Sequence, residues 1–255
     1  MNEKSLFDYY IKKTENNFKG WDFSYITDTD RMVDSPLDWS YISKVFKYIY
    51  EKDVNTMLDM GTGGGELLSK FIKIPPNTYA TEGYEANLPI ARKRLKSLGI
   101  EVVKVENDIL NFKNNYFDLL INRHESYSVK EIKRVLKEKG IFITQQVGNQ
   151  NCLEINQALG AKEDMDLGKW DLNVAKNDLI KSDFKIVKSF EQFPELRFYD
   201  IGALIYYLKA VPWQIKDFTI NKFHSKLKEI HNLIQKENYF AVKEHRFFLI
   251  AQKSV

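Results

Sequence analysis

The stretch MLDMGTGGGELL, Met57–Leu68, decides the fold of this chain. It sets four glycines between two apolar segments and places an acid on each side, in the order Asp59, Gly61, Gly63, Gly64, Gly65, Glu66. Glycine allows a positive backbone φ and lets a ligand approach the main chain closely. A helix that follows such a loop offers free N–H groups to a bound anion. The stretch therefore predicts a strand, a ligand-binding loop and a helix.

Strands and helices are predicted to alternate on both sides of this loop. Apolar runs rich in β-branched and aromatic residues predict strands at 54–60, 78–82, 100–105, 117–122, 141–146, 184–194 and 239–253. Helical spacing predicts helices at 34–52, 66–74, 85–99, 129–140, 149–160 and 172–184, the first capped by Asp34 or Ser35 and the third ended by Gly99. The alternation is typical of an α/β fold with a parallel sheet that helices cover on both faces.

Length and composition suit a single domain over 1–255 that comprises an N-terminal helical cap at 1–53, a core at 54–150 and a helical lid at 199–238. The net charge is +3 with 29% charged residues, so no strong bias toward nucleic acid or membrane exists. A single cysteine excludes a disulfide framework and a cysteine-rich zinc site, and we expect no metal. With no apolar signal core at the N-terminus, we expect a soluble cytoplasmic protein of undetermined oligomeric state.

The residues of the loop limit the classes of ligand that it is expected to bind. A phosphate-binding loop needs Gly-Lys-Ser/Thr, but Glu66 follows Gly65. A dinucleotide loop needs a glycine at the position of Glu66. Carboxylates beside the loop would also repel the negatively charged pyrophosphate of a dinucleotide and so disfavour its binding. Acids at Asp59 and Glu66 suit a ligand that carries positive charge. S-adenosylmethionine, with an ammonium and a sulfonium and no phosphate, is such a ligand.

Acids after the next two strands fit the same ligand. Glu82 ends the second strand 21 residues after Gly61, where an acid accepts ribose hydroxyls. Asp108 follows the third strand and is placed to accept the adenine amino group, and Tyr84 is placed to stack on the base. Asp59 is equally well interpreted as an anchor for loop amides. The predicted cofactor-binding residues are Asp59, Gly61, Thr62, Gly63, Gly65, Glu82, Gly83, Tyr84, Asn107, Asp108, Ile109 and Asn122.

The segments LDMGTGGGE, TEGYEANLPIARKRL, ENDIL and FDLLINRHE…VLKEKGIFITQQVG resemble the successive motifs of class I S-adenosylmethionine-dependent methyltransferases. The resemblance runs from Val54 to Val147. It implies a Rossmann-like, mostly parallel sheet of seven strands in the order 3-2-1-4-5-7-6, with the seventh strand antiparallel and a helical insert between the last two strands. It also implies that S-adenosylmethionine is converted to S-adenosylhomocysteine. The tail resembles stand-alone bacterial members with unassigned substrates.

Methyl transfer from a sulfonium mainly requires alignment of the acceptor, the methyl group and the sulfur. The carboxyl ends of the fourth and fifth strands face the transfer site in open α/β sheets, which singles out 122–126 and 145–149. His124 is the candidate general base and Glu125 its orienting partner or a ligand for a substrate amine. Asn122, Gln145 and Gln146 offer amide groups. Each of these residues is also compatible with an ordinary surface or structural role.

Departures from known motifs exclude two mechanisms. The sequence NRHE after the fourth strand lacks the Pro-Pro-aromatic motif of nucleobase amino-methylases. Cys152 lacks the Pro-Cys context of a cytosine-C5 nucleophile and is expected to be a buried thiol. Aromatic residues near the N-terminus and in the insert are candidates for an apolar substrate pocket, although most will be core: Trp21, Phe23, Tyr25, Trp39, Tyr199, Tyr206, Tyr207 and Trp213.

Three functions remain open. The first is methyl transfer to an oxygen or nitrogen of a small metabolite, because the aromatic insert would exclude a polymer. The second is an RNA methyltransferase, since residues 209–255 carry nine lysines and arginines against four acids. The third is a non-catalytic protein that binds the cofactor as a sensor. We expect a small-molecule partner, no membrane, and nucleic acid only in the second case.

Overall fold

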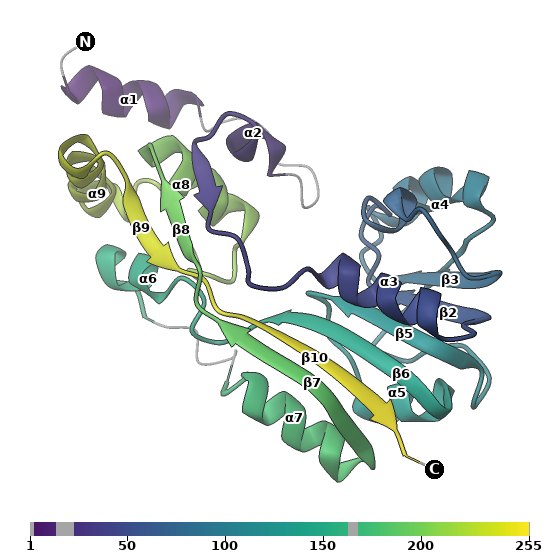
Figure 1. The fold of residues 1–255 in the computed structure, drawn as a ribbon. Helices are drawn as coiled ribbons and strands as arrows, with labels where there is room; N and C mark the ends of the chain where they lie inside the picture. The colour runs from purple at the N-terminus through teal and green to yellow at the C-terminus, as the bar shows by residue number, and fades with distance from the viewer. Residues whose placement is uncertain (1–2, 14–22, 163–167, 255) are drawn as a thin grey trace. The chain divides into compact units, whose positions relative to one another are not determined.

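The computed structural model describes residues 3–13, 23–162 and 168–254, and these form two compact units (Figure 1). The sheet unit comprises 38–148, 170–191 and 246–255, and the second unit comprises 1–37, 149–169 and 192–245. Residues 1–53, which we expected to form one cap, are therefore divided between both units. Trp21 lies outside the described residues.

A seven-stranded sheet forms the centre of the sheet unit. Its strands are β2 (Thr56–Met60), β3 (Asn77–Glu82), β4 (Glu101–Lys104), β5 (Phe117–Arg123), β6 (Leu136–Val147), β7 (Phe184–Gln192) and β10 (Arg246–Lys253). They are ordered β4-β3-β2-β5-β6-β10-β7, with β10 antiparallel to β6. Counted along the sequence this is the order 3-2-1-4-5-7-6, so the predicted topology is confirmed.

Helices cover both faces of this sheet. They are α3 (Tyr41–Glu51), α4 (Leu88–Leu95), α5 (Val129–Val135) and α7 (Leu172–Lys181), with short 3-10 turns η1 (Leu68–Lys70) and η2 (Lys96–Leu98). Helices α5 and α7 bury their apolar residues with Leu58, Leu120 and Phe142 of the strands. On the opposite face the Tyr41 ring of α3 packs edge-on against Phe248, with centroids 6.3 Å apart. Burial of these apolar surfaces is the main stabilising contribution to the unit.

Four predicted element boundaries are wrong. The helix predicted from residue 34 begins at Tyr41 with Ser40 as its cap, because Asp34 is paired in a strand with Leu196. The helix predicted at 66–74 is only the turn η1, since Gly65 has a positive φ and Pro75 follows closely.

The helix predicted to run to residue 140 ends at Val135, because Leu136 pairs with Phe117 in β6. Sheet pairing here overrides the helix propensity of the Lys-Glu-Lys segment. The long strand predicted at 239–253 is two strands that pair in different sheets.

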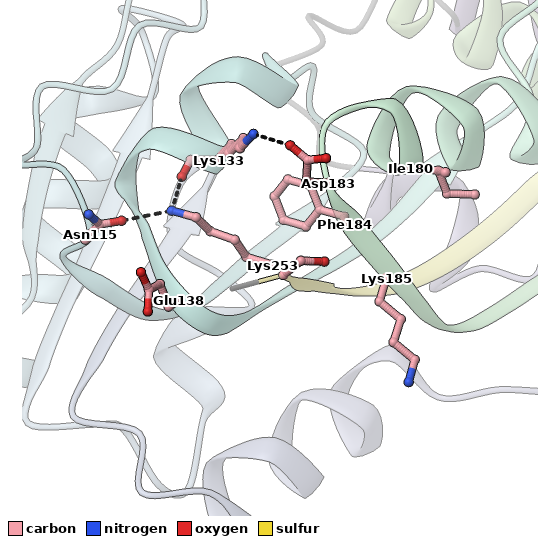
Figure 2. A pocket seen from close by; sticks show the side chains of 9 residues that line it. Asn115, Lys133, Glu138, Ile180, Asp183, Phe184, Lys185 and Lys253 are labelled. Carbon is pink, nitrogen blue, oxygen red and sulfur yellow. Dashed lines mark hydrogen bonds and ion pairs between the residues drawn. The ribbon is translucent and has the colours of Figure 1, made fainter.

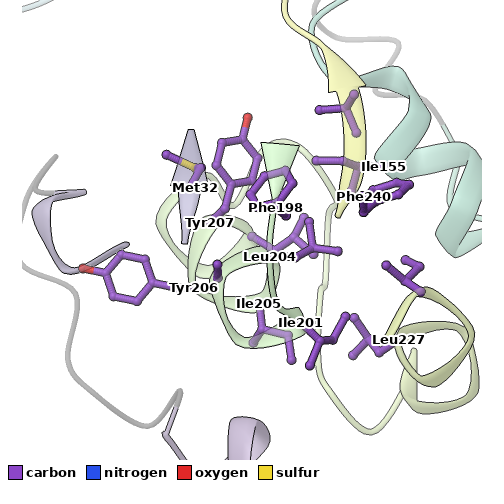
Figure 3. Packing of buried hydrophobic residues seen from close by; sticks show 14 of the residues in the cluster. Met32, Ile155, Phe198, Ile201, Leu204, Ile205, Tyr206, Tyr207, Leu227 and Phe240 are labelled. Carbon is purple, nitrogen blue, oxygen red and sulfur yellow. The ribbon is translucent and has the colours of Figure 1, made fainter. Parts of the chain in front are cut away.

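The second unit contains a small sheet packed with helices. Its elements are α1 (Glu3–Lys13), α2 (Ser24–Thr27), β1 (Met32–Asp34), α6 (Leu153–Leu159), β8 (Glu195–Phe198), α8 (Ile201–Ala210), α9 (His224–Glu237) and β9 (Phe240–Lys243), with the sheet order β1-β8-β9. Figure 3 shows how Leu204 and Tyr207 of α8 and Leu227 of α9 pack in its core. Both helices lie within 199–238, where a helical insert was predicted. Cys152 is buried here as expected.

A partly buried ion pair joins the start of α8 to the N-terminal segment. Arg31 donates through Nε and Nη2 to the two carboxylate oxygens of Asp200, over 2.6 and 2.7 Å. Asp200 also caps α8, since its Oδ1 accepts the N–H of Ala203 over 2.9 Å. In the part of the chain that the structure describes, no helix is both long and apolar enough to cross a bilayer.

Candidate active site

The glycine loop follows the carboxyl end of β2 and adopts a backbone conformation that favours glycine. Gly61, Gly63 and Gly65 have φ values of 67°, 63° and 81°, in the left-handed region that costs other residues about 1–2 kcal/mol. The loop is held to β3, because the Thr62 N–H donates to the Thr81 carbonyl over 2.8 Å. The backbone is therefore fixed in place, with Gly61 and Gly63 half-buried and Gly64 and Gly65 buried.

Side chains press against two of these glycines. A Cβ at Gly61 would collide with the Glu125 side chain, and one at Gly65 would lie 2.9 Å from Leu95 Cγ. The nearest atom to a Cβ at Gly63 is Glu66 Oε2 at 3.7 Å, an ordinary van der Waals contact, so a Cβ would not collide there. Gly61 is needed for the approach of Glu125, whereas Gly63 is needed for its backbone conformation.

Four carboxyl groups surround the loop. Asp59 and Glu82 stand at the ends of β2 and β3 and are 5% and 4% exposed. The Tyr84 N–H donates to Glu82 Oε1 over 2.7 Å, which fixes that carboxylate at the strand end. Ser126 Oγ donates to Asp108 Oδ1 over 2.8 Å. Glu125, half-buried, lies against Gly61. The predicted acids thus gather at the carboxyl edge of the sheet.

The acids disfavour one another's charge. Burial raises the pKa of Asp59 to about 7, and the nearby Glu82 contributes in the same direction. Burial also raises the pKa of Glu125, again with contributions from Glu82 and Asp108. A cationic ligand in this place would relieve the repulsion and favour the ionised carboxylates.

The aromatic and aliphatic side chains predicted to contact the adenine are exposed to solvent. Tyr84 and Ile109 are 60% and 55% exposed, so both side chains are accessible to a ligand. Asn107 and Asp108 both have positive φ, at 53° and 57°, in the turn closed by the Ile109 N–H to the Glu106 carbonyl. Gly83 is exposed beside Tyr84. This turn resembles the glycine loop in presenting main chain at a strand end.

Asn122 is fully buried on the other face of the sheet. Its Oδ1 accepts from Thr144 Oγ1 over 2.9 Å and from Gln146 Nε2 over 2.6 Å. The Gln146 amide also donates to the Glu125 carbonyl over 3.0 Å. Asn122 thus positions Gln146, which supports the Glu125 backbone, while the buried Asn122 amide nitrogen has no hydrogen-bond partner among the described residues.

His124 is attached to the neighbouring strand. Its N–H donates to the Gln145 carbonyl over 2.8 Å, and its Nε2 lies 3.2 Å from Gln145 Nε2. Because the Gln145 Oε1 accepts from Trp39 Nε1 over 2.9 Å, its amide nitrogen faces His124 and donates to it. The imidazole is then neutral, with its proton on Nδ1.

The electrostatic surroundings of His124 also favour its neutral form. Desolvation lowers the pKa of the ring well below its usual value, although the side chain keeps contact with solvent. The guanidinium groups of Arg246 and Arg123 contribute to this shift. The arrangement favours a hydrogen-bond donor at Nδ1 over a proton acceptor.

Several residues of this region were not among the predicted site residues. Trp39 was considered only as a pocket wall, and Arg123 lay in the segment 122–126 without an assigned role. Arg94 donates to the Gly64 carbonyl and to the Glu66 carboxylate, so it clamps the loop. Its side chain comes from α4, and no local pattern could have revealed this contact. Of the other candidate aromatics, those within the described residues lie in the second unit.

A further pocket lies in the sheet unit, away from the glycine loop. Among the described residues, no group of three or more histidine, cysteine and acidic side chains is placed to hold a metal ion. A pocket near the starts of β5 and β7 is lined by Lys133, Asp183 and Lys253 (Figure 2). It lies at the opposite edge of the sheet from the glycine loop. Lys133 and Lys253 are engaged in structural contacts, and the pocket does not form part of the candidate site.

Comparison with known proteins finds a matching domain model and solved structures with the same fold. Residues 58–144 match the family model described as a methyltransferase domain. A protein from Bacillus halodurans C-125, assigned provisionally to the methyltransferases, shares the fold at a TM-score of 0.60 and 16% identity, over 84% of this chain and 99% of its own.

Two further solved structures share the fold at low identity. YcgJ from Bacillus subtilis has a TM-score of 0.59 and 12% identity, over 84% of this chain and 98% of its own. A protein from Galdieria sulphuraria, provisionally named a sarcosine dimethylglycine methyltransferase, has values of 0.52 and 13%, over 84% of each chain. Among curated proteins no match was found.

Proposed function

We propose that this chain, whose residues 58–144 match a methyltransferase domain, is a class I S-adenosylmethionine-dependent methyltransferase that binds S-adenosylmethionine at the glycine loop and methylates an oxygen or nitrogen of a small metabolite. The single observation that carries the cofactor assignment is the set of Asp59, Glu82 and Asp108 around a loop in which Gly61 and Gly63 have positive φ and are only half-buried. This donor set is negative and suits a ligand with two cationic groups.

Each residue has a role in this proposal. The loop backbone at Gly61 and Gly63 holds the amino-acid end of the cofactor, and Asp59 compensates its positive charge. Glu82 accepts the ribose hydroxyls through the oxygen that does not bind Tyr84. Asp108 accepts the adenine amino group, while Tyr84 and Ile109 contact the base. The backbone at Thr62, Gly65, Gly83 and Asn107 shapes these contacts.

The bound cofactor supplies a methyl group that is already activated on a sulfonium, so the protein mainly aligns the acceptor. His124 donates a hydrogen bond from Nδ1 to the acceptor. Glu125, with its raised pKa and its place beside Gly61, accepts a proton from a hydroxyl acceptor or pairs with an amine. Asn122 holds Glu125 in position through Gln146.

The alternative acceptor is RNA. The lysine-rich character of residues 209–255 favours it, but those residues also suit the solvated faces of helix α9. The small-metabolite proposal is supported by the like-folded protein from Galdieria sulphuraria, whose provisional name specifies a small amine acceptor. A screen with a methyl-labelled cofactor against fractionated metabolites and RNA separates the two acceptors. Label in RNA, with binding that weakens steeply with salt, would contradict the small-metabolite proposal.

Calorimetric titration with S-adenosylhomocysteine tests the cofactor site. Glu82→Gln removes the charge but keeps the shape, and we expect a loss of at least tenfold in affinity. The matched control is Glu85→Gln, an exposed neighbouring acid that pairs with Lys104 over 2.7 Å. We expect the control to bind as wild type does. Equal affinities of the two variants would show that Glu82 is not part of the site.

A further inference from the structure

The first residue of helix α3 buries a hydroxyl group that forms no hydrogen bond. Tyr41 is 5% exposed, and its Oη has no hydrogen-bond partner in the part of the chain that the structure describes. Burial of a hydroxyl without a partner is unfavourable, and folded proteins satisfy the large majority of such groups. Beside a binding site, an unpartnered hydroxyl of this kind indicates a group to which a bound ligand supplies the partner.

Tyr41 lies at the carboxyl edge of the sheet, on the face that carries Asp59. Its ring packs edge-on against Phe248 of β10, which pairs in register with Gln145 near the end of β6. The pairing of β2 with β5 and of β5 with β6 places Asp59, Arg123 and Gln145 on one face, because side chains alternate along a strand and paired residues share a face. The Tyr41 hydroxyl is therefore buried on the same face as an acid and a guanidinium group.

The electrostatic effects of these groups on one another show that they are neighbours. Burial raises the pKa of Tyr41, and the negative charge of Asp59 contributes in the same direction. The Arg123 guanidinium and the nearby Asn122 main chain, which does not reach hydrogen-bond geometry, act in the opposite direction. Arg123 and Asp59 also favour each other's charged form. The hydroxyl is thus a neutral hydrogen-bond donor beside one negative and one positive group.

We propose that Tyr41 Oη donates a hydrogen bond to the carboxylate at the amino-acid end of the bound cofactor. That end is a zwitterion, with an ammonium and a carboxylate on one carbon atom. Asp59 pairs with the ammonium, whereas Arg123 compensates the charge of the carboxylate that accepts from Tyr41. Since Asp59 lies two residues before Gly61, a ligand that meets both Asp59 and Tyr41 is the one held by the glycine loop.

The inference rests on the function proposed above and adds a cofactor-binding residue from outside the glycine loop and the strand ends. Calorimetric titration with S-adenosylhomocysteine and with its decarboxylated analogue, which keeps the amine, the sugar and the base, tests the contact. Tyr41→Phe removes the hydroxyl and keeps the ring against Phe248. We expect this variant to bind S-adenosylhomocysteine at least fivefold more weakly than wild type and to bind the analogue with unchanged affinity.

The matched control is Tyr50→Phe, because Tyr50 belongs to the same helix and is 56% exposed. We expect the control to bind both ligands as wild type does. A second measurement, without ligand, distinguishes binding from a structural role. Since the Tyr41 hydroxyl has no partner to lose, Tyr41→Phe should unfold at no lower urea concentration than wild type. A clear loss of ligand-free stability would show that the hydroxyl serves the fold and would overturn the inference.

The outcomes separate this inference from the broader proposal. If the wild-type protein does not bind S-adenosylhomocysteine, the cofactor site itself is wrong. If wild type and Tyr41→Phe bind it equally well, Tyr41 does not contact the carboxylate, but the cofactor site stands. Weakening of both ligands by the same factor has the same meaning, because the analogue has no carboxylate with which the hydroxyl could pair.

Discussion

Gln145 binds His124 at two points, through its carbonyl to the His124 N–H at 2.8 Å and through its side-chain amide to Nε2 at 3.2 Å. His124 has a φ of 62°, a conformation that costs a non-glycine residue free energy unless its surroundings hold it. The Gln145 amide is itself oriented by Trp39. A strained histidine with a fixed tautomer at the end of β5 is thus maintained by contacts from outside its own strand.

The first prediction concerns the protonation of His124. We expect its ring to titrate below the ordinary value of about 6.5, with the proton of the neutral form on Nδ1. As pH falls below the unfolded-state pKa, the unfolded chain takes up a proton that the folded protein refuses, so stability declines. Ring 15N shifts across a pH series measure both properties. A pKa at or above the ordinary value, or a proton on Nε2, would contradict this arrangement.

The second prediction concerns Asp59. Its pKa of about 7 means that the folded state holds a proton between the unfolded value of about 3.9 and 7, so this group's contribution to stability is lost as pH rises through that window. Binding of a cationic cofactor favours the ionised form, so we expect proton release on binding near pH 6.5. Calorimetry in buffers of different ionisation enthalpy measures it. Asp59→Asn should abolish the release, and equal release by this variant would exclude Asp59 as its source.

The third prediction separates the two reasons for glycine in the loop. Gly63→Ala incurs only the cost of a positive φ, about 1–2 kcal/mol. Gly61→Ala adds the collision with Glu125, and overpacking typically costs about 1–3 kcal/mol more. Urea denaturation of both variants measures the difference. Equal losses of unfolding free energy would mean that Glu125 moves away from Gly61 without cost.

The fourth prediction concerns the pocket at the opposite edge of the sheet. Lys253 Nζ donates to Asn115 Oδ1 over 2.8 Å and to the carbonyl of Lys133 over 2.7 Å (Figure 2). It also donates to the carbonyl of Leu136 over 2.7 Å. These carbonyls belong to the end of α5, where a cation is favourable. Lys253→Met should lower the unfolding free energy by about 1–3 kcal/mol.

The matched control for that variant is Lys185→Met, since Lys185 is an exposed lysine that lines the same pocket. We expect it to change stability by no more than about 0.5 kcal/mol. Neither substitution should affect cofactor affinity, because both lysines lie away from the glycine loop. If both variants lose equal stability, the contacts of Lys253 do not cap α5.

The sequence predicts the order of the strands in the large sheet better than it predicts the boundaries and pairing of the elements around it. The strand order was correct because it follows from a family resemblance carried by local motifs. The helix predicted through residue 140 was wrong, since Leu136 joins a strand through its pairing with Phe117. The strands β8 and β9 flank the predicted helical insert and form a sheet with β1 that no periodicity within the insert indicated. Pairing between distant segments is not written in any local pattern.

The sequence by itself determined the glycine loop and the acids after three successive strands, because backbone freedom and strand ends are local properties. Only the tertiary structure decided that Glu125 presses on Gly61, that Arg123 and Arg246 share a face, and that Trp39 orients Gln145 from 106 residues away. These contacts join segments distant in the chain, and side-chain packing and strand register bring them together only once the sheet has formed.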